Sequence, residues 1–488
     1  MALFFRVVNK LVIFSVFIAV LFSDFLPLSL GGYASQRLVL SFVIIFYVLS
    51  FVWVRANEKG WPSGLYPCAL LVFAFLLLSM PFRGQAYVWI EPGMYAGYFL
   101  SVVLAGSIPR APGNRQEWVH TFVVAGGIAA AFYGCASLTV YVFALSDGVS
   151  SLSKYIPWGF VNIRYWSHIA TWLLPILPLA VLVGPLKDER LWKFFVGLGA
   201  ALWWWIVFLS TSRGTMVSVA FGVMFVALLM GRPALPWLRV FLRYLAFGVV
   251  AWLVLSVLIP SVLVDEVTLR QIKSDTSGRM PLFIEAWRMS LVNFPFGMGP
   301  QSWLTHEIIT DAYQSSQKFG HPHNMYLMWA AEYGWILIFA MLLLVVQAIY
   351  RFWKRRCEIQ AMSTTDGRQI QAVSLAAFTA SVSAALVHAG ASAVFMAPGS
   401  MLIGFLVLSI FWALISPSVD TPSSSSWGRR VLAVSVAGIA GILWVLWFGE
   451  VLDYYHAMEN DLVDYQENGS GGMMPRFWFH GNFPRAGQ

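Results

Sequence analysis

Charged residues are scarce in this 488-residue chain, because Asp, Glu, Lys and Arg together make up only 11% of it. Hydrophobic residues make up 59%, and the mean hydropathy is +0.71. A soluble globular domain is apolar over about half of its residues. The composition therefore excludes a soluble globular protein and indicates a membrane protein.

The chain also has few cysteines and no nucleotide-binding motif. The three cysteines, Cys68, Cys135 and Cys357, form no CxxC pair and have no histidine partner at metal spacing, so they indicate no metal or redox site. The chain contains no Walker A or GxGxxG pattern, so nothing indicates a nucleotide as energy source. The net charge of +8 does not predict nucleic-acid binding, because the basic residues lie in short loops between apolar runs.

Apolar runs long enough to cross a bilayer follow one another along the chain and predict about 13 transmembrane helices. They cover residues 11–30, 37–54, 66–82, 87–107, 118–146, 166–184, 192–210, 213–230, 241–261, 323–350, 370–392, 398–416 and 431–450. The first run is too long for the core of a signal peptide, so we interpret it as an uncleaved helix. The predicted fold class is all-α, a polytopic membrane protein of about 12–13 transmembrane helices with a helical cap.

The basic loop residues predict the orientation of these helices. If the N-terminus is cytoplasmic, successive groups of lysines and arginines all fall on the cytoplasmic side, as the positive-inside rule requires. These groups are Arg55 and Lys59; Arg110 and Arg115; Lys187, Arg190 and Lys193; Arg232, Arg239 and Arg243; Arg351, Lys354, Arg355, Arg356 and Arg368; Arg429 and Arg430. The external side then holds Arg164, Arg213, Arg279 and Arg288.

The interval 262–322 is the longest internal polar segment, and we expect it to form an external helical cap. Ser277 is a candidate N-cap for a helix that starts at Gly278 and lies on the membrane interface. Within that helix we expect Arg288 to pair with Glu285, one turn earlier. A tight turn is predicted over 294–300, followed by a second amphipathic stretch over about 301–315.

The same pattern divides the chain into four predicted parts. Residues 1–150 form the N-terminal transmembrane helices, and 151–350 form a catalytic transmembrane core that includes the cap. Residues 351–450 form the C-terminal transmembrane helices. Residues 451–488 form an external tail, which we expect to be partly disordered.

Two histidines stand where the cap runs into a membrane helix, in the sequence His321-Pro322-His323-Asn324. An imidazole beside an acceptor hydroxyl can act as a general base, and the Asn324 amide can orient the ring or a sugar. A His-x-His pair can also bind a metal, but no third ligand stands at helical spacing. A polar structural role is the remaining alternative.

Three external arginines are candidates for binding phosphate. Arg213 lies in Ser212-Arg213-Gly214, where a hydroxyl and a glycine beside a guanidinium suit a phosphate. Arg164 has the same external placement, and Arg279 opens the cap helix. The alternative for Arg213 and Arg164 is an interfacial anchor that extends to lipid headgroups.

The ionisable residues inside apolar runs, where an unpaired charge is costly, include Glu91, Glu332 and His388. For Glu332 we expect pairing with an arginine or a buried hydroxyl. Glu91 and His388 are more often packing residues than catalysts, and Glu91 stays a weak candidate. A secondary transporter would use all three as a proton relay, but the paired broken helices of such proteins are absent from the sequence.

Several of these motifs, taken in order, resemble the O-antigen ligase and polymerase superfamily. They are Ser212-Arg213-Gly214, Ser277-Gly278-Arg279 with Trp287, Gly297-x-Gly299, and the run from His323-Asn324-x-x-Leu327 to Glu332-x-Gly334. The resemblance covers about residues 150–345. Upstream helices agree only in hydropathy, and a thirteenth helix and the tail go beyond the roughly twelve-helix core that the family suggests.

The resemblance implies a GT-C-like glycosyltransferase of the bacterial inner membrane with a periplasmic active site. It implies that Arg213 and Arg279, with Arg164, hold the diphosphate of an undecaprenyl-diphosphate-linked glycan. It also implies that His323 acts on the acceptor hydroxyl. The candidate catalytic residues are therefore His323, His321 and Arg279, and we expect Asn324, Glu332 and Ser212 to support them. Neither a metal nor another cofactor is expected.

Two reactions share this chemistry. A ligase passes the finished glycan to lipid A-core, whereas a polymerase passes it to the next lipid-linked repeat unit. We favour ligation, with O-antigen or exopolysaccharide polymerisation as the alternative. A chain-length regulator protein is a candidate partner.

Overall fold

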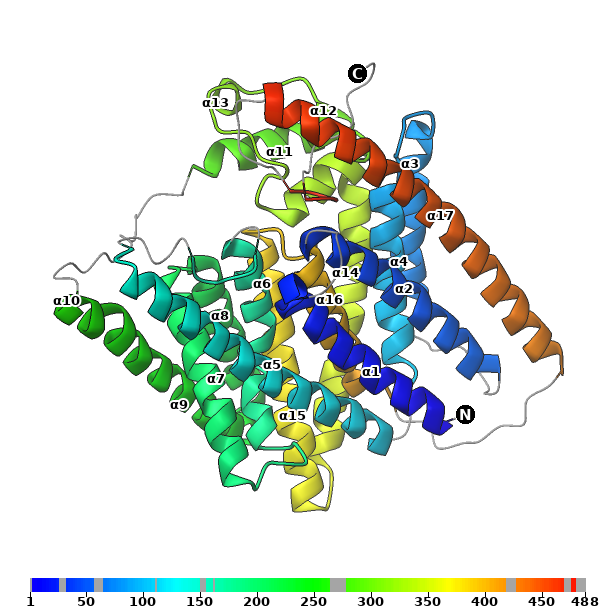
Figure 1. Ribbon diagram of the computed structural model, residues 1–488. Coiled ribbons are helices and arrows are strands. Elements are labelled where there is room, and N and C mark those ends of the chain that lie inside the picture. Colours follow the sequence, from blue (N-terminus) through cyan, green and yellow to red (C-terminus); the bar gives the residue numbers. More distant parts are fainter. Residues whose placement is uncertain are drawn as a thin grey trace.

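The computed structural model describes residues 2–25, 32–56, 65–109, 112–149, 155–160, 163–263, 278–417, 427–468 and 475–479. These ranges are mainly helical and contain no β-strand, which confirms the all-α prediction. Ten helical segments within them are long and apolar enough to cross a membrane. The chain is thus a polytopic helical bundle (Figure 1).

The helices follow one another in three groups along the chain. Before the cap come α1 (Ala2–Leu21), α2 (Gly32–Ala56), α3 (Leu65–Ser79), α4 (Ile90–Gly106), α5 (Pro112–Ser146), α6 (Ile163–Leu173), α7 (Arg190–Leu209), α8 (Arg213–Met230), α9 (Leu235–Trp252) and α10 (Ile259–Leu263). The cap holds α11 (Met280–Val292), α12 (Ser302–Thr305) and α13 (Asp311–Gln314). After it come α14 (Met325–Gln360), α15 (Thr365–Ala389), α16 (Pro398–Ile415) and α17 (Trp427–Asn468).

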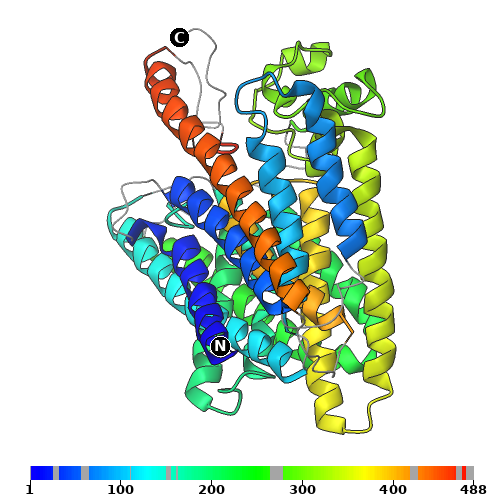
Figure 2. The same ribbon diagram turned by 90° about the vertical axis from the view of Figure 1, so that its right-hand side faces the viewer.

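Helix α16 lies in the core of the bundle, where α2, α4, α6 and α15 pack against it. Nearly all of its residues are apolar or small, so the helix is buried along almost its whole length. Helix α17 lies at the edge of the bundle against α2 (Figure 2). It continues to Asn468, well beyond residue 450, where the last apolar run was expected to end.

Helix α6 is shorter than the predicted run 166–184 because prolines interrupt it. It ends at Leu173, and Pro175 and Pro178 precede or enter the 3-10 segment η4 (Leu177–Val181). A proline has no backbone N–H and cannot continue an α-helix. The first turn of α6 lies at the same end of the bundle as the cap, since its Arg164 contacts His323, which directly follows the cap.

The cap helices gather at one end of the bundle, at the top of Figure 1. We call this end the cap face and the other end the opposite face. The buried side of α11 packs with Trp303 and Tyr313 in a small core of its own. Its other side, which includes Met280, Ile284, Trp287 and Leu291, is exposed, as a helix on a membrane interface requires.

The carboxylate of Glu285 organises the cap. It accepts the backbone N–H groups of Ile309 and Thr310, at 2.7 and 3.0 Å, and the amphipathic stretch expected over about 301–315 contains the short helices α12 and α13. Glu285 also binds His306, at 2.9 Å, so the prediction that it pairs with Arg288 is wrong. The proposed N-cap Ser277 lies outside the described residues.

Helix α14 is interrupted at Gly334, whose φ of 84° and ψ of 174° are not helical. The cap turn 294–299 fills the break. The N–H groups of Met298 and Gly299 bind the carbonyls of Ala331 and Glu332, at 2.8 and 2.9 Å. The glycine turn predicted from the sequence therefore fixes the part of α14 that carries Glu332.

We predict that Gly334→Ala destabilises the protein by at least about 2 kcal/mol. A Cβ at this position would stand 2.1 Å from the Pro295 carbonyl oxygen, on a backbone that only glycine adopts readily. The measurement is the Tm of detergent-purified protein from tryptophan fluorescence. Gly441→Ala, where nothing lies within 4 Å of the new Cβ, is the control and should lose nothing. Equal Tm values for Gly334→Ala and wild type would contradict this explanation of the break.

Candidate active site

Three arginines from separate elements lie close together on the cap face. Arg164 is in the first turn of α6, Arg213 is the first residue of α8, and Arg279 is the N-cap residue of α11. Burial, followed by the charges of Arg164 and Arg213, lowers the pKa of Arg279 to about 10. Arg279 is thus near enough to Arg164 and Arg213 for their charges to repel its own, and an anion beside Arg279 would relieve that repulsion.

Arg279 is held at the end of α15 by a bond from its Nη1 to the Ala391 carbonyl, at 2.8 Å. Its Nε is buried and has no acceptor within the described parts of the chain. A buried guanidinium N–H without an acceptor is rare in a resting structure and suits a site that receives a ligand oxygen.

The two histidines adopt different roles in the loop before α14. The Nδ1 of His321 accepts the backbone N–H of His323 at 3.0 Å, and the ring centroids are 4.4 Å apart. His323 has a φ of 58°, which is uncommon for a residue with a side chain. His321 therefore stabilises the strained backbone that carries His323.

The protonation of His323 follows from its contact with Arg164. The Nε2 of His323 lies 3.3 Å from Nη1 of Arg164. A guanidinium only donates, so Nε2 is the acceptor and the proton of the neutral ring is on Nδ1. That Nδ1 is buried and finds no partner among the residues described.

Both imidazoles are held neutral. Burial, followed by the charges of Arg476, Arg164 and Arg279, lowers the pKa of His321 to about 3. Burial, followed by His321, Arg164 and Arg279, lowers the pKa of His323 far below the ordinary histidine value. The site in its resting state thus combines neutral rings with permanent cations.

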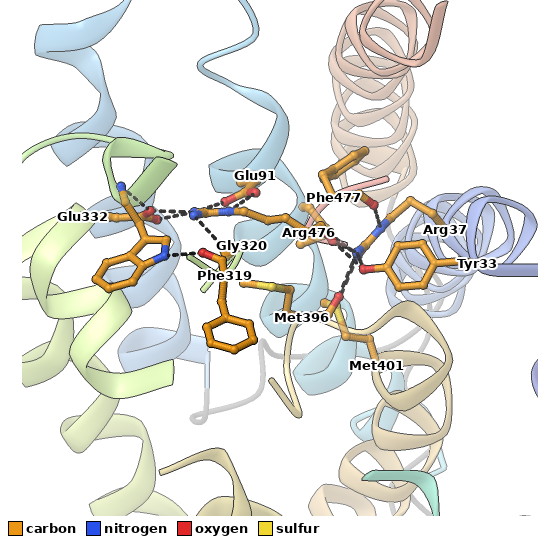
Figure 3. A network of polar contacts seen from close by, with 12 residues as sticks. Tyr33, Arg37, Glu91, Phe319, Gly320, Glu332, Met396, Met401, Arg476 and Phe477 are labelled. Carbon is orange, nitrogen blue, oxygen red and sulfur yellow. Dashed lines mark hydrogen bonds and ion pairs between the residues drawn. The ribbon is translucent and has the colours of Figure 1, made fainter. Parts of the chain in front are cut away.

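A second polar cluster lies beside this loop and was not foreseen (Figure 3). Arg476, from the C-terminal segment 475–479, is 1% exposed. It binds both carboxylate oxygens of Glu91, at 2.8 and 2.9 Å, and both of Glu332, at 2.6 and 2.7 Å. The expectation that Glu332 pairs with an arginine is confirmed, and Glu91 shares the same partner. The described part of the tail is thus packed into the protein.

The residues expected to support the site are engaged locally. The side-chain oxygen of Asn324 caps α14 by accepting the N–H groups of Tyr326 and Leu327, both at 3.1 Å. Ser212 precedes α8, and its hydroxyl lies 2.7 Å from that of Ser210. These residues shape the two helix starts, and neither contact reaches the histidine rings.

His388 behaves as the packing residue that its position suggested. Its Nδ1 lies 2.8 Å from the Thr171 hydroxyl, and its ring stands against that of His168, with centroids 5.1 Å apart. A Cβ on Gly214 would come within 2.4 Å of its Nε2, so Gly214 is needed for close contact between α8 and α15.

The described residues contain no group of three or more histidine, cysteine, aspartate or glutamate side chains arranged to hold a metal ion. They do bring cations and a neutral imidazole to one place. Such a site can bind a polyanion and accept or donate one proton.

Fold and site together define a class: a polytopic membrane protein with a cationic, imidazole-containing site on its capped face. A family model described as O-antigen ligase matches residues 198–357, from within α7 to near the end of α14. This match confirms the resemblance to the O-antigen ligase superfamily over that segment, and it implies a glycosyltransferase-like enzyme. Arg213, Arg279 and His323 lie inside the matched range, whereas Arg164 precedes it. No curated protein matches the chain.

The depressed pKa of His321 predicts a loss of stability in acid. Its folded pKa of about 3 lies below the unfolded value of about 6.5, so between them the unfolded chain binds a proton that the folded protein excludes. The contribution is complete above pH 6.5 and is lost as the pH falls, by about 1.4 kcal/mol at pH 5.5.

The comparison that isolates this effect is the Tm at pH 7.5 and 5.5 for wild type and His321→Gln. The glutamine can still accept the N–H of His323 but does not titrate. Wild type should lose more Tm than the variant between the two pH values. Parallel losses would mean that His321 is not held neutral by the fold.

Proposed function

We propose that the protein transfers a glycan from undecaprenyl diphosphate to an acceptor sugar hydroxyl at the periplasmic face of the bacterial inner membrane. The observation that carries the proposal is the contact of His323 with Arg164 within reach of the charge of Arg279. A diphosphate carries several negative charges, and guanidinium groups bind such oxygens in pairs. A base close to the same anion is the arrangement that glycosyl transfer from a lipid diphosphate needs.

The arginines serve the leaving group in this proposal. As the bond between the anomeric carbon and the phosphate oxygen breaks, its electron pair passes to the diphosphate. Arg164, Arg213 and Arg279 neutralise that growing charge in a partly dehydrated site, where fixed cations act more strongly than in water. The energy for transfer is already stored in the sugar–phosphate bond.

His323 serves the acceptor. When diphosphate oxygens take up Arg164, the Nε2 lone pair of His323 is released and can accept the proton of the acceptor hydroxyl. The bound anion also offsets the cations that depress the pKa of His323, so the ring becomes a better base in the complex than at rest. The hydroxyl oxygen then attacks the anomeric carbon in a single displacement, which inverts its configuration.

Ligation to lipid A-core is the favoured reaction, and polymerisation of lipid-linked repeat units is the alternative. The cation site supplies chemistry common to both reactions, since they differ only in the acceptor.

The basic residues support the proposed orientation in the membrane, with the cap face in the periplasm. Arg232, Arg356 and Arg368 line one cavity away from the cap, and Arg115 and Arg355 line another, as expected if the opposite face is cytoplasmic.

The variants Arg213→Ala, Arg279→Ala and His323→Ala should each lower transfer by about 10²- to 10³-fold while the protein stays in the membrane. Arg288→Ala is the control, because Arg288 is exposed and lies roughly opposite Arg279 around α11. It should change transfer by less than about threefold. The measurement is glycan transfer in membranes at matched protein level. Wild-type rates in the three site variants would refute the site.

A lipopolysaccharide gel of a strain lacking this gene separates the two reactions. Rough core with accumulated long lipid-linked chains is the result expected for a ligase. Core bearing a single repeat would instead show a polymerase. An unchanged ladder would contradict both and direct attention to another glycan or to transport.

A further inference from the structure

The C-terminal segment 475–479 is held from the α2 side through its backbone. Arg37 donates from Nε to the Phe477 carbonyl at 2.8 Å and from Nη2 to the Arg476 carbonyl at 3.0 Å. The Tyr33 hydroxyl donates to the same Arg476 carbonyl, at 2.5 Å. Two donors buried in α2 thus fix the backbone of a segment about 440 residues away in sequence.

Aromatic side chains seat the same segment against α17. The rings of Phe477 and Tyr454 have centroids 5.9 Å apart, and those of Trp478 and Tyr455 are 5.0 Å apart. The guanidinium of Arg37 lies over the Phe477 ring, 4.8 Å from its centroid. Phe477 and Trp478 are both buried, so the segment has a defined seat on apolar and cationic surfaces.

From this seat the side chain of Arg476 reaches the histidine loop, as Figure 3 shows. Its Nη1 donates to the carbonyl of Gly320, at 3.3 Å, and Gly320 directly precedes His321. Its other nitrogens bind Glu91 at the start of α4 and Glu332 on α14.

Glu332 adds a connection to the cap. One of its oxygens also accepts the N–H of Trp303, at 3.2 Å, and the indole N–H of Trp303 binds the Phe319 carbonyl at 2.9 Å. Arg476 and Trp303, which both bind Glu332, thus also bind the carbonyls of Gly320 and Phe319, the two residues before His321.

We propose that Arg476 is a positioning residue for the histidine loop, so that the C-terminal segment sets the place of His323 relative to Arg164. The inference rests on the proposed function, because it matters to catalysis only if His323 acts on the acceptor. Without Arg476, two buried carboxylates lose their common cation and the Gly320 carbonyl loses a donor. The carboxylates would then draw in water or move apart, and the loop between them would lose its anchor.

The first test uses Arg476→Met and Arg476→Lys. A displaced base slows the chemical step but does not disturb diphosphate binding by Arg164, Arg213 and Arg279. In Arg476→Met, kcat should therefore fall at least tenfold, while KM for the lipid-linked donor stays within about twofold. Arg476→Lys should recover part of kcat, since lysine restores one charge but not the forked contacts.

The second test does not depend on activity. Diethyl pyrocarbonate acylates neutral, accessible imidazoles, and mass spectrometry assigns the modified residue. His323 is 4% exposed, so its labelling should be slow in wild type and several-fold faster in Arg476→Met.

A matched control is Arg115→Met. Arg115 is also a buried arginine that joins distant segments, through bonds to the carbonyls of Pro109, Ser416 and Pro417 at 2.7 to 3.0 Å, but it lies away from the cap face. The Arg115→Met variant should change neither kcat nor His323 labelling.

If Arg476→Met does not fold, the double variant Glu91→Gln/Arg476→Met replaces it. Removing one carboxylate together with the guanidinium leaves the formal charge of the cluster at its wild-type value, so the loss of Arg476 is tested without an added buried charge.

The outcomes separate the two proposals. Faster labelling together with a lower kcat supports the inference. Unchanged labelling, or equal changes in Arg115→Met, overturns it even if wild type transfers glycan normally. Faster labelling with an unchanged kcat overturns the link to catalysis. If purified wild type transfers no glycan, the proposed function fails, and labelling alone then decides whether Arg476 positions the loop.

Discussion

The cost of burying charge on the cap face governs this structure. Glu91 and Glu332 are both nearly inaccessible, and in a low-dielectric setting neither could remain ionised without a partner. Arg476 satisfies both and is itself held by Tyr33 and Arg37 from α2. Five segments far apart in sequence, α2, α4, the histidine loop, α14 and the C-terminal segment, are thereby tied at one point. The break in α14 at Gly334 belongs to the same arrangement, because it frees carbonyls that hold the cap turn.

Pairing of the carboxylates also gives the neighbouring site its positive character. Glu285 is satisfied within the cap by His306 and Thr310. Burial raises its pKa, but the bonds from Ile309, Thr310 and His306 outweigh this and keep it below the ordinary glutamate value. Three buried carboxylates thus have partners of their own, while Arg164 and Arg213 act on Arg279, and Arg164 and Arg279 act on His323. A site of this kind favours an anion before any substrate is considered.

Much of this architecture follows from local sequence patterns. Apolar runs predict the helices, and a glycine turn, a His-x-His pair and arginines at helix starts predict where the site lies, because each signal spans only a few residues. The contact between Glu91 and Arg476 joins residues 385 apart, and no periodicity encodes it. A partial signal existed, since a glutamate inside an apolar run needs a partner such as an arginine, and Arg476 is followed by the aromatic residues Phe477, Trp478 and Phe479. The capping role of Asn324 and the single tautomer of His323 depend on three-dimensional contacts.

The most direct test of the central claim uses purified protein in lipid nanodiscs with an undecaprenyl-diphosphate-linked glycan of known anomeric configuration. Lipid A-core is the acceptor, with a second lipid-linked repeat unit in a parallel reaction, and no nucleotide is added. We predict transfer to one acceptor with inversion at the anomeric carbon, release of undecaprenyl diphosphate, and an intact donor when His323→Ala replaces wild type. Retention of configuration, or full transfer by His323→Ala, would contradict the proposed mechanism.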